Sequence, residues 1–440
     1  MTSGPEDGAA GTVRVGFLGC GTVGAEAVRI LADRREAIAR YSGVDVEVRR
    51  IAVRDLGADR GLAVAAGVLT DDPYSVVTAD DVDLVVEVMG GTDPAGALVA
   101  KALERSKPVV TANKALMASA GPALLDKAEA ANVDLLYEAS VGGGIPIIRP
   151  LTETLAGEYV HRVMGIVNGT TNYILTRMDE EGADFGTVLA DAQALGYAEA
   201  EPSADVDGHD AAQKAAILAT LAFGTRVHDT DVPTEGIRGV HAHDLELGRR
   251  LGYVVKLLAI AEYDAGADAV LARVFPAMIP ESHPLATVRL SYNAVFVEGE
   301  SAGSLMFYGQ GAGAGPTAMA VVGDIVDAAR NLRQGARGPH VSRRHLHGMK
   351  DAADATSQFY VRLEVEDRPG VLAEIAQTFG DHGVSLKSVL QEGREDDAEL
   401  VMVTHASREA DVEKAVAGIG ALGGVETVAA VLRVVADEVS

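Results

Sequence analysis

The sequence has a single cysteine, no tryptophan and few basic residues for its length of 440 residues. Cys20 alone cannot form an internal disulfide, and a zinc site needs several thiolates, so a reducing compartment is expected. Lys plus Arg number 38 against 64 Asp plus Glu, a net charge of −26. This acidic field repels phosphate backbones and anionic lipids, which excludes nucleic acid and membrane partners. No secretory signal or apolar run of about 18 residues is found, so we expect a soluble cytoplasmic protein.

The alternation of apolar runs and helical stretches predicts an α/β chain of about three domains. Continuous apolar runs such as VRVGFLG and DLVVEVMGG, separated by helices, are typical of a doubly wound, Rossmann-type parallel sheet. The last 80 or so residues repeat strand and helix in the order βαββαβ, a ferredoxin-like domain. The expected organisation is a disordered N-terminus at 1–11, a dinucleotide-binding domain at 12–142 to which a helix at 315–332 returns, an α+β substrate and dimerisation domain at 143–310, a linker at 333–357, and a small regulatory domain at 358–440.

Gly19, Gly21 and Gly24 form a GxGxxG motif between a predicted strand and a predicted helix. The glycines permit a tight turn, the approach of a pyrophosphate and close helix packing, while the helix N-terminus faces the anion. A glycine-rich turn without a ligand is the alternative. The second predicted strand ends in Arg54 and Asp55. Arginine there suits the 2′-phosphate of NADP(H), whereas a solvated Arg54 would leave Asp55 to bind the ribose of NAD(H).

Three further segments carry candidate chemical groups. Lys114 follows the end of a predicted sheet strand, where open α/β sheets bind ligands. In GIVNGTTNYILT, Asn168 or Thr170 is placed to cap a helix. The third segment gathers five carboxylates before Lys214, which lies four residues after the last of them and shares a helix face with it. These carboxylates are Glu199, Glu201, Asp205, Asp207 and Asp210.

A lysine beside a carboxylate can supply the proton that an alkoxide needs when hydride is transferred to a carbonyl. Lys114 and Lys214 are the candidates, and the remaining carboxylates could hold an ammonium group, so an amino-acid-like substrate is expected. The alternative for Asp210 and Lys214 is an ordinary exposed ion pair on a helix surface.

Seven segments from residue 13 to about 329 together resemble the homoserine dehydrogenase family. They are the glycine loop, GGTDPA, TANK, YEASVGGGIPII, GIVNGTTNYIL, GYAEAEPSADVDGHDAAQK and GAGAGPTAMAVVGD. The resemblance implies reversible NAD(P)H-dependent reduction of L-aspartate 4-semialdehyde to L-homoserine, in threonine, methionine and isoleucine biosynthesis. Glu201 departs from the family, which commonly has Asp before the proline, and this affects the fine shape of the pocket.

The resemblance also implies roles for individual residues. Lys214 would be the proton donor or acceptor, and Lys114 would lie near the nicotinamide and the reacting oxygen. Glu199 and Asp210 would bind the amino and hydroxyl groups of the substrate, with Asp205 supporting them. The implied cofactor-binding residues are Gly19, Gly21, Thr22, Val23, Gly24, Arg54, Thr92, Lys114, Gly196 and Gly313.

A monovalent cation, usually Na+, is a further feature of the family that YEASVGGGIP resembles. Backbone carbonyls of this loop would hold it, with a structural role. Read without the resemblance, the segment is a glycine turn after a strand, and no spacing rule detects carbonyl ligands. The implied positions are Glu138, Val141, Gly143 and Ile145.

The C-terminal segment VEDRPGVLAEIAQTFGDHGVSLKSV is similar to ACT domains, which sense amino acids. The resemblance implies an effector at an interface between two copies, with L-threonine, the downstream product, as that effector. A dimerisation module without a ligand is the alternative. We expect a homodimer or homotetramer. The implied effector positions are Asp367, Arg368, Pro369 and Gly370.

Two other functions compete with this one. A phosphorylating semialdehyde dehydrogenase needs a cysteine nucleophile, and Cys20 is misplaced for that role because it lies in the glycine loop, where a packing role is expected. A non-catalytic amino-acid sensor on a dehydrogenase scaffold is the second. The presence of Lys114, Glu199, Asp210 and Lys214 together argues against the sensor.

Overall fold

The computed structural model describes residues 11–338, 347–394 and 397–435. Most of the expected disordered N-terminus (1–10) and part of the expected linker (339–346) lie outside the described residues. The chain divides into two compact units that alternate along the sequence. The first comprises residues 1–159, 216–229 and 307–346, and the second comprises 160–215, 230–306 and 347–440.

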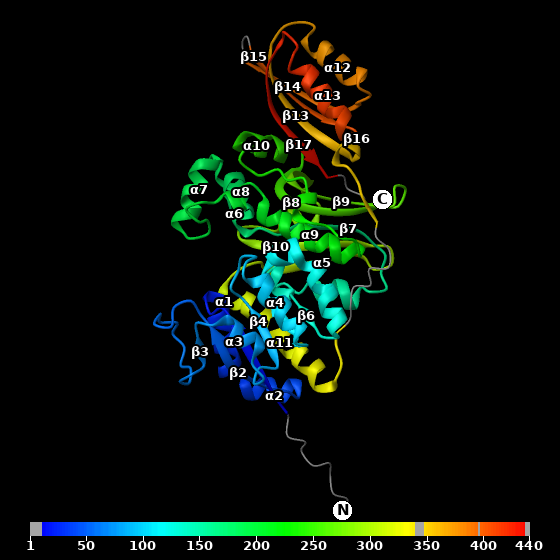
Figure 1. Ribbon diagram of the computed structural model, residues 1–440. Helices are drawn as coiled ribbons and strands as arrows, with labels where there is room; N and C mark the ends of the chain where they lie inside the picture. The colour runs from blue at the N-terminus through cyan, green and yellow to red at the C-terminus, as the bar shows by residue number, and fades with distance from the viewer. Residues whose placement is uncertain (1–10, 339–346, 395–396, 436–440) are drawn as a thin grey trace, which may run out of the picture. The chain divides into compact units, whose positions relative to one another are not determined.

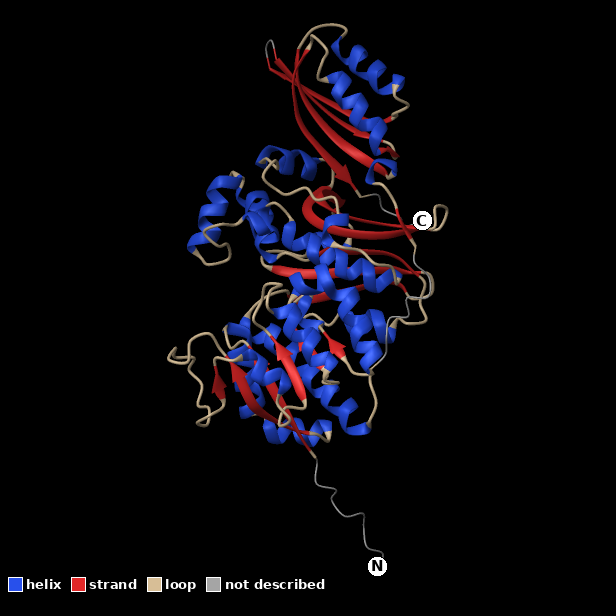
Figure 2. Ribbon diagram, in the orientation of Figure 1, coloured by secondary structure: helices blue, strands red, loops and turns tan. Residues whose placement is uncertain are grey.

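The first unit contains a parallel sheet of six strands in the order β3-β2-β1-β4-β5-β6. This is the Rossmann strand order, which confirms the predicted fold class. Residues of β4 and β5 are all buried, as expected for a sheet with helices on both faces (Figure 2). The strands are β1 (Thr12–Leu18), β2 (Asp45–Ala52), β3 (Leu69–Thr70), β4 (Leu84–Glu87), β5 (Val109–Thr111) and β6 (Leu135–Leu136).

The helices of this unit include one from late in the chain. Helix α11 (Ala314–Gln334) packs against α1 (Thr22–Asp33), and its Val321 and Ile325 join Val15 and Phe17 of β1 in one buried cluster. Helix α9 (His209–Phe223) begins in the second unit and ends in the first. The other elements are α2 (Arg35–Ser42), α3 (Pro73–Thr78), α4 (Ala95–Glu104), α5 (Lys114–Ala131), the 3-10 helix η1 (Glu138–Ser140) and the π-helix η2 (Pro150–Thr154).

The second unit is built on a mixed sheet in the order β11-β10-β7-β8-β9-β17-β13-β15-β14. The antiparallel β8 and β9 are long and lie in the middle of this order, with β9 buried at every residue but its last and β8 buried over its seven central residues. Its strands before the C-terminal domain are β7 (Val160–Ile166), β8 (Tyr253–Asp264), β9 (Ala269–Pro280), β10 (Tyr292–Gly299) and β11 (Gly303–Gln310), whose end belongs to the first unit. Its helices there are α6 (Gly169–Glu181), α7 (Phe185–Ala194), α8 (Ser203–Val206), α10 (Ala242–Arg250), η3 (Asp229–Asp231) and η4 (Pro284–Thr287).

The C-terminal part has the predicted βαββαβ order. Helices α12 and α13 contact each other on one face of its sheet (Figure 1). Strand β17 pairs with β13 on one side and, in parallel, with β9 on the other, so this domain extends the central sheet. The elements are β12 (Gly348–Met349), η5 (Ala352–Asp354), β13 (Thr356–Glu366), α12 (Val371–Asp381), β14 (Leu386–Arg394), β15 (Asp397–Thr404), β16 (Ser407–Arg408), α13 (Glu409–Ile419) and β17 (Val425–Val434).

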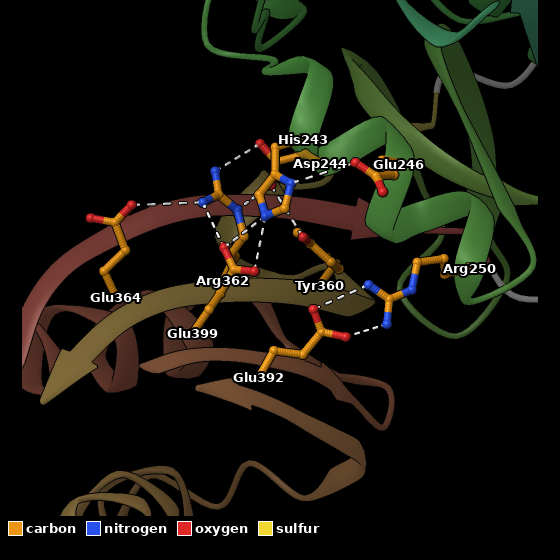
Figure 3. A network of polar contacts seen from close by, with 9 residues as sticks. All are labelled: His243, Asp244, Glu246, Arg250, Tyr360, Arg362, Glu364, Glu392 and Glu399. Carbon is orange, nitrogen blue, oxygen red and sulfur yellow. Dashed lines mark hydrogen bonds and ion pairs between the residues drawn. The ribbon is translucent and has the colours of Figure 1, made fainter. Parts of the chain in front are cut away.

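A buried polar network joins α10 to the C-terminal strands (Figure 3). Asp244 is fully buried, and its Oδ1 accepts hydrogen bonds from Arg362 Nε at 2.6 Å and from the Tyr360 hydroxyl at 3.1 Å. Burial and the neighbouring Asp244 carboxylate raise the pKa of Tyr360, so its phenol remains a neutral donor. His243 Nε2 lies 2.9 Å from Glu399 at the edge of the same network. These contacts fix α10 to the C-terminal sheet.

A second polar contact lies beside the strand junction. The buried carboxylate of Glu409 on α13 accepts from Arg433 Nη2 of β17 at 2.9 Å and also bonds to Arg273 of β9. Two arginines beside one carboxylate compensate the cost of burying its charge.

Among the described residues, no helix is both long and apolar enough to cross a bilayer.

Candidate active site

A buried ammonium group is the centre of the candidate site in the second unit. Lys214 Nζ donates to the Val167 carbonyl at 2.5 Å and to Asp210 Oδ2 at 2.7 Å. The Lys214 side chain is 10% exposed and that of Asp210 is 6% exposed. The alternative of an exposed surface pair therefore does not describe this contact. Helix α9 begins at His209, so both side chains lie one turn apart in its first two turns.

Asn168 connects this pair to a second carboxylate. It is the N-cap of α6, where its Oδ1 accepts from Thr171 N at 2.9 Å, as a capping role predicts. Its Nδ2 donates to Asp205 Oδ1 at 2.7 Å and to Asp210 Oδ2 at 2.9 Å. One amide and one ammonium thus offset the repulsion between two carboxylates. The sequence suggested the cap, but no signal in it indicated the bridge.

Two other carboxylates of the acidic segment have partners of their own. Asp207 pairs with Arg238, and this hydrogen bond lowers the pKa of the carboxyl group. Glu201 accepts from Ser203 at the start of α8, and this contact lowers its pKa. Glu199 is exposed in the loop between α7 and α8. Of the five acidic residues before Lys214, Asp210 bonds to the lysine and Asp205 is joined to Asp210 through Asn168.

The loop that carries Glu199 is anchored on α6. Tyr197 stacks on Tyr173 with ring centroids 4.6 Å apart, and Thr170 Oγ1 donates to the Tyr197 carbonyl at 2.8 Å. Gly196 begins this loop with φ +78°, a conformation that favours glycine. The loop thus starts from a defined position above the N-terminal half of α6.

The glycine motif of the first unit has the geometry that a dinucleotide needs. Gly19 has φ +98°, and a Cβ there would lie 2.8 Å from the Val88 carbonyl oxygen. A Cβ on Gly24 would lie 2.9 Å from the Gly19 carbonyl oxygen, so close packing requires glycine at both positions. A Cβ on Gly21 would meet nothing within 4 Å, so this face is open. Gly21 is also the N-cap of α1 and has no side chain to occupy the anion position.

The remaining predicted cofactor residues in this unit lie in loops or at helix starts. Cys20, the packing residue expected within the glycine loop, is buried, and burial raises the pKa of its thiol. Arg54 and Asp55 are exposed just after β2, and Thr92 is exposed in the loop after β4. The others are Thr22 and Val23, the first residues of α1, Lys114, the first residue of α5, and Gly313, the N-cap of α11 with φ +123°.

The loop predicted to hold a cation uses its acidic side chain internally. Glu138 Oε1 accepts from the amides of Ile147 at 2.6 Å and Ile148 at 2.8 Å, and Oε2 accepts from Arg149 N at 2.9 Å. Within the described residues there is no His, Cys, Asp and Glu cluster that could hold a metal. A cation here would therefore depend on backbone carbonyls, which fits a turn that contains two left-handed glycines. The other predicted positions, Val141, Gly143 and Ile145, belong to this turn.

The predicted effector loop borders a cavity of about 350 Å³ between β13 and α12. Gly370 has φ +100° and is the N-cap of α12. Arg368 Nε donates to Glu366 at 2.6 Å, and Gln391 Nε2 of β14 donates to Asp367 at 3.4 Å. Pro369 completes the loop, so the four predicted positions lie together along this cavity.

Comparison with known proteins decides the family. A family model for homoserine dehydrogenase matches residues 146–326, one for its NAD-binding domain matches 19–138, and one for the ACT domain matches 359–424. A homoserine dehydrogenase from Corynebacterium glutamicum is 48% identical over 98% of both chains. One from Mycobacterium tuberculosis is 49% identical over 96% of this chain and 97% of the other. The chain belongs to the homoserine dehydrogenase family.

Solved homoserine dehydrogenases support the same assignment. One from Thiobacillus denitrificans matches with a TM-score of 0.91 and 38% identity, covering 97% of this chain and 99% of that one. A hyperthermophilic archaeal homoserine dehydrogenase in complex with NADPH matches with a TM-score of 0.62 and 28% identity, over 72% of this chain and 98% of that one. The chain is thus an oxidoreductase with an NAD-binding domain and an ACT domain.

The bridge made by Asn168 predicts that its amide is needed for homoserine dehydrogenase activity. Asn168→Ser keeps a helix cap but cannot reach both carboxylates. We expect kcat to fall by about 10²-fold, the loss typical of a small misplacement of reacting groups, while the melting temperature stays near that of the wild type. Asp184→Ser, the same kind of change at the N-cap of α7, is the control and should leave kcat unchanged. Normal kcat in Asn168→Ser would contradict a role beyond capping.

Proposed function

We propose that the protein catalyses the reversible NAD(P)H-dependent reduction of L-aspartate 4-semialdehyde to L-homoserine. The observation that carries this proposal is the buried Lys214–Asp210 pair, joined to Asp205 through Asn168. The reaction would serve threonine, methionine and isoleucine biosynthesis in the cytoplasm. A non-catalytic amino-acid sensor on the same scaffold is the alternative, and any turnover of the semialdehyde eliminates it.

Lys214 is proposed as the acid that protonates the forming alkoxide, and as the base in the reverse direction. The nicotinamide cofactor supplies or accepts the hydride when it is bound. Within the described residues the Lys214 ammonium has two acceptors, so one of its three N–H bonds remains for the substrate oxygen. Asp210 holds the ammonium in place and stabilises its charge. Lys114, at the start of α5, is proposed to lie near the nicotinamide and the same oxygen.

The acidic residues are proposed to bind the amino-acid part of the substrate. Glu199 is exposed and has a carboxylate suited to an ammonium group, while Asp210 is proposed to bind the hydroxyl group. Asp205 supports them through Asn168. Asp207 is not included because its carboxylate pairs with Arg238.

Lys214→Met should lower kcat by about 10²- to 10⁴-fold, since proton transfer by a positioned group contributes that much. The Kd for NADPH should stay within about twofold, because the glycine motif is made by other residues. Lys107→Met is a matched control: Lys107 is also buried and bonded to a carbonyl, but it precedes β5 at the opposite edge of the sheet from the ligand edge. Measured turnover of Lys214→Met near the wild-type value, in folded protein, would refute the assigned role.

NADP(H) is proposed as the preferred cofactor, with NAD(H) also accepted. The exposed guanidinium of Arg54 after β2 can pair with a 2′-phosphate. Arg54→Ala should raise KM for NADPH roughly tenfold, by loss of a charge-assisted contact, and leave KM for NADH unchanged. Asp55→Asn is the paired variant, and it tests the alternative in which Asp55 binds the ribose. If Asp55→Asn raised KM for NADH alone and Arg54→Ala left KM for NADPH unchanged, NAD(H) would be the preferred cofactor instead.

A monovalent cation, Na+ in the first instance, is proposed at the turn of Glu138, Val141, Gly143 and Ile145. Its ligands would be backbone carbonyls, because the Glu138 carboxylate already accepts three backbone amides. Such an ion would hold the turn in shape and take no part in proton transfer.

A homodimer or homotetramer is proposed as the assembly, because ACT domains generally pair.

L-threonine is proposed to bind at the ACT loop and to slow the enzyme. A ligand there can regulate only if it favours one conformation over another. Titration with L-threonine should lower turnover in the wild type, and Asp367→Ala should remove this response while keeping the basal rate. Glu413→Ala, an exposed change on α13, is the control and should respond normally. If L-threonine affects neither turnover nor melting temperature, the ACT domain is a dimerisation module.

A further inference from the structure

Glu87 is a buried carboxylate outside the glycine motif and the Lys214 site. It is the last residue of β4, at the edge of the parallel sheet where such folds bind ligands, and its side chain is fully buried. A buried carboxylate is costly unless its oxygens accept hydrogen bonds. Those of Glu87 do, and every donor lies in a segment at this same edge.

The first oxygen holds the loop that follows β4. Glu87 Oε1 accepts from Met89 N at 2.9 Å and from Gly90 N at 3.3 Å. This loop leads to Thr92, one of the predicted cofactor residues. Because the carboxylate takes both amides, the backbone turns back over the end of its own strand and has a fixed position.

The loop held by Glu87 also supports the glycine motif. A Cβ on Gly19 would lie 2.8 Å from the Val88 carbonyl oxygen and 2.9 Å from Met89 Cα, so the two backbones are in close contact. A Cβ on Gly24 would lie 3.0 Å from a methyl group of Val88. A shift of residues 88 and 89 would therefore displace the turn that is proposed to bind the pyrophosphate.

The second oxygen leads to the start of α5. Glu87 Oε2 accepts from Thr111 Oγ1 at 2.6 Å, and Thr111 Oγ1 in turn accepts from Asn113 N at 3.0 Å. Asn113 caps α5 and also donates from Nδ2 to the Gly91 carbonyl at 2.6 Å. Lys114 is the next residue. The chain of bonds therefore closes a ring that includes the loop after β4 and the helix start that carries Lys114.

We propose that Glu87 is a positioning residue for the nicotinamide cofactor. Its carboxylate fixes, through one hydrogen-bonded ring, the turn beneath the glycine motif, the loop to Thr92 and the helix start at Lys114. Glu87 itself does not touch the cofactor. This role rests on the proposed function, because it takes the ligand to be a nicotinamide dinucleotide. NADPH is the probe in the binding experiments.

Glu87→Leu, which removes both acceptors at similar size, should weaken NADPH binding roughly ten- to hundredfold, the range for lost hydrogen bonds to a charged group. In the apo protein it should also speed amide hydrogen exchange in the peptide that contains residues 88–92. Glu87→Gln keeps one acceptor oxygen and should recover most of the affinity. Thr111→Val, which is nearly isosteric, should give a smaller loss and serves if Glu87→Leu does not fold.

Val85→Ala is the matched control, because Val85 is fully buried two residues earlier on the same strand. It should lower the melting temperature and leave the Kd for NADPH and the exchange of residues 88–92 unchanged. Equal loss of NADPH affinity in Val85→Ala, or normal affinity and exchange in Glu87→Leu, would overturn the positioning role. Wild-type protein that binds NADPH but does not turn over the semialdehyde would refute the proposed function alone, since these readouts do not depend on turnover.

Discussion

The candidate chemistry depends on keeping a charged lysine inside the protein beside two carboxylates. Removing an ammonium from water costs several kcal/mol, so Lys214 is stable only where acceptors stand in fixed positions. The Val167 carbonyl and Asp210 provide these acceptors. Asn168 donates hydrogen bonds to both Asp210 and Asp205, which offsets the repulsion between the two carboxylates. A strand end, a helix cap and the first turns of α9 must therefore meet at one place. This requirement explains why the polar turn between β7 and α6 is buried at its centre.

The parts of this site that could be predicted from the sequence are those with a local spacing rule. Asp210 and Lys214 are four residues apart in a helix, and the glycine motif lies between a strand and a helix, so the local pattern predicts both. The bridge from Asn168 to Asp205 and Asp210 spans 37 and 42 residues and has no such rule. The same is true of Glu87, which reads simply as the end of an apolar strand. Side chains that organise a site through tertiary contacts are invisible to periodicity.

In the acidic segment, the sequence predicts more carboxylates near Lys214 than the structure brings there. Between α8 and α9 the chain turns at Gly208, which has φ +85°. A Cβ at this position would lie 2.8 Å from a methyl group of Thr234. The turn separates carboxylates that are neighbours in sequence, so Asp207 meets Arg238 while Asp210 meets Lys214. Counting acidic residues predicted a carboxylate-rich pocket, but only backbone geometry selects which of them share it.

The fold class was predictable because each sheet has its own hydrophobic pattern, whereas the joining of the ACT strands to the central sheet was not. The β17–β9 pairing and the Asp244–Arg362 contact connect residues more than 100 positions apart. Separating these elements would leave buried charges without their partners, which is costly. Helix α10 in turn contacts α6, the helix that Asn168 caps. Within this unit, the ACT strands are therefore connected through packed elements to the helix whose cap, Asn168, bridges the two carboxylates beside Lys214.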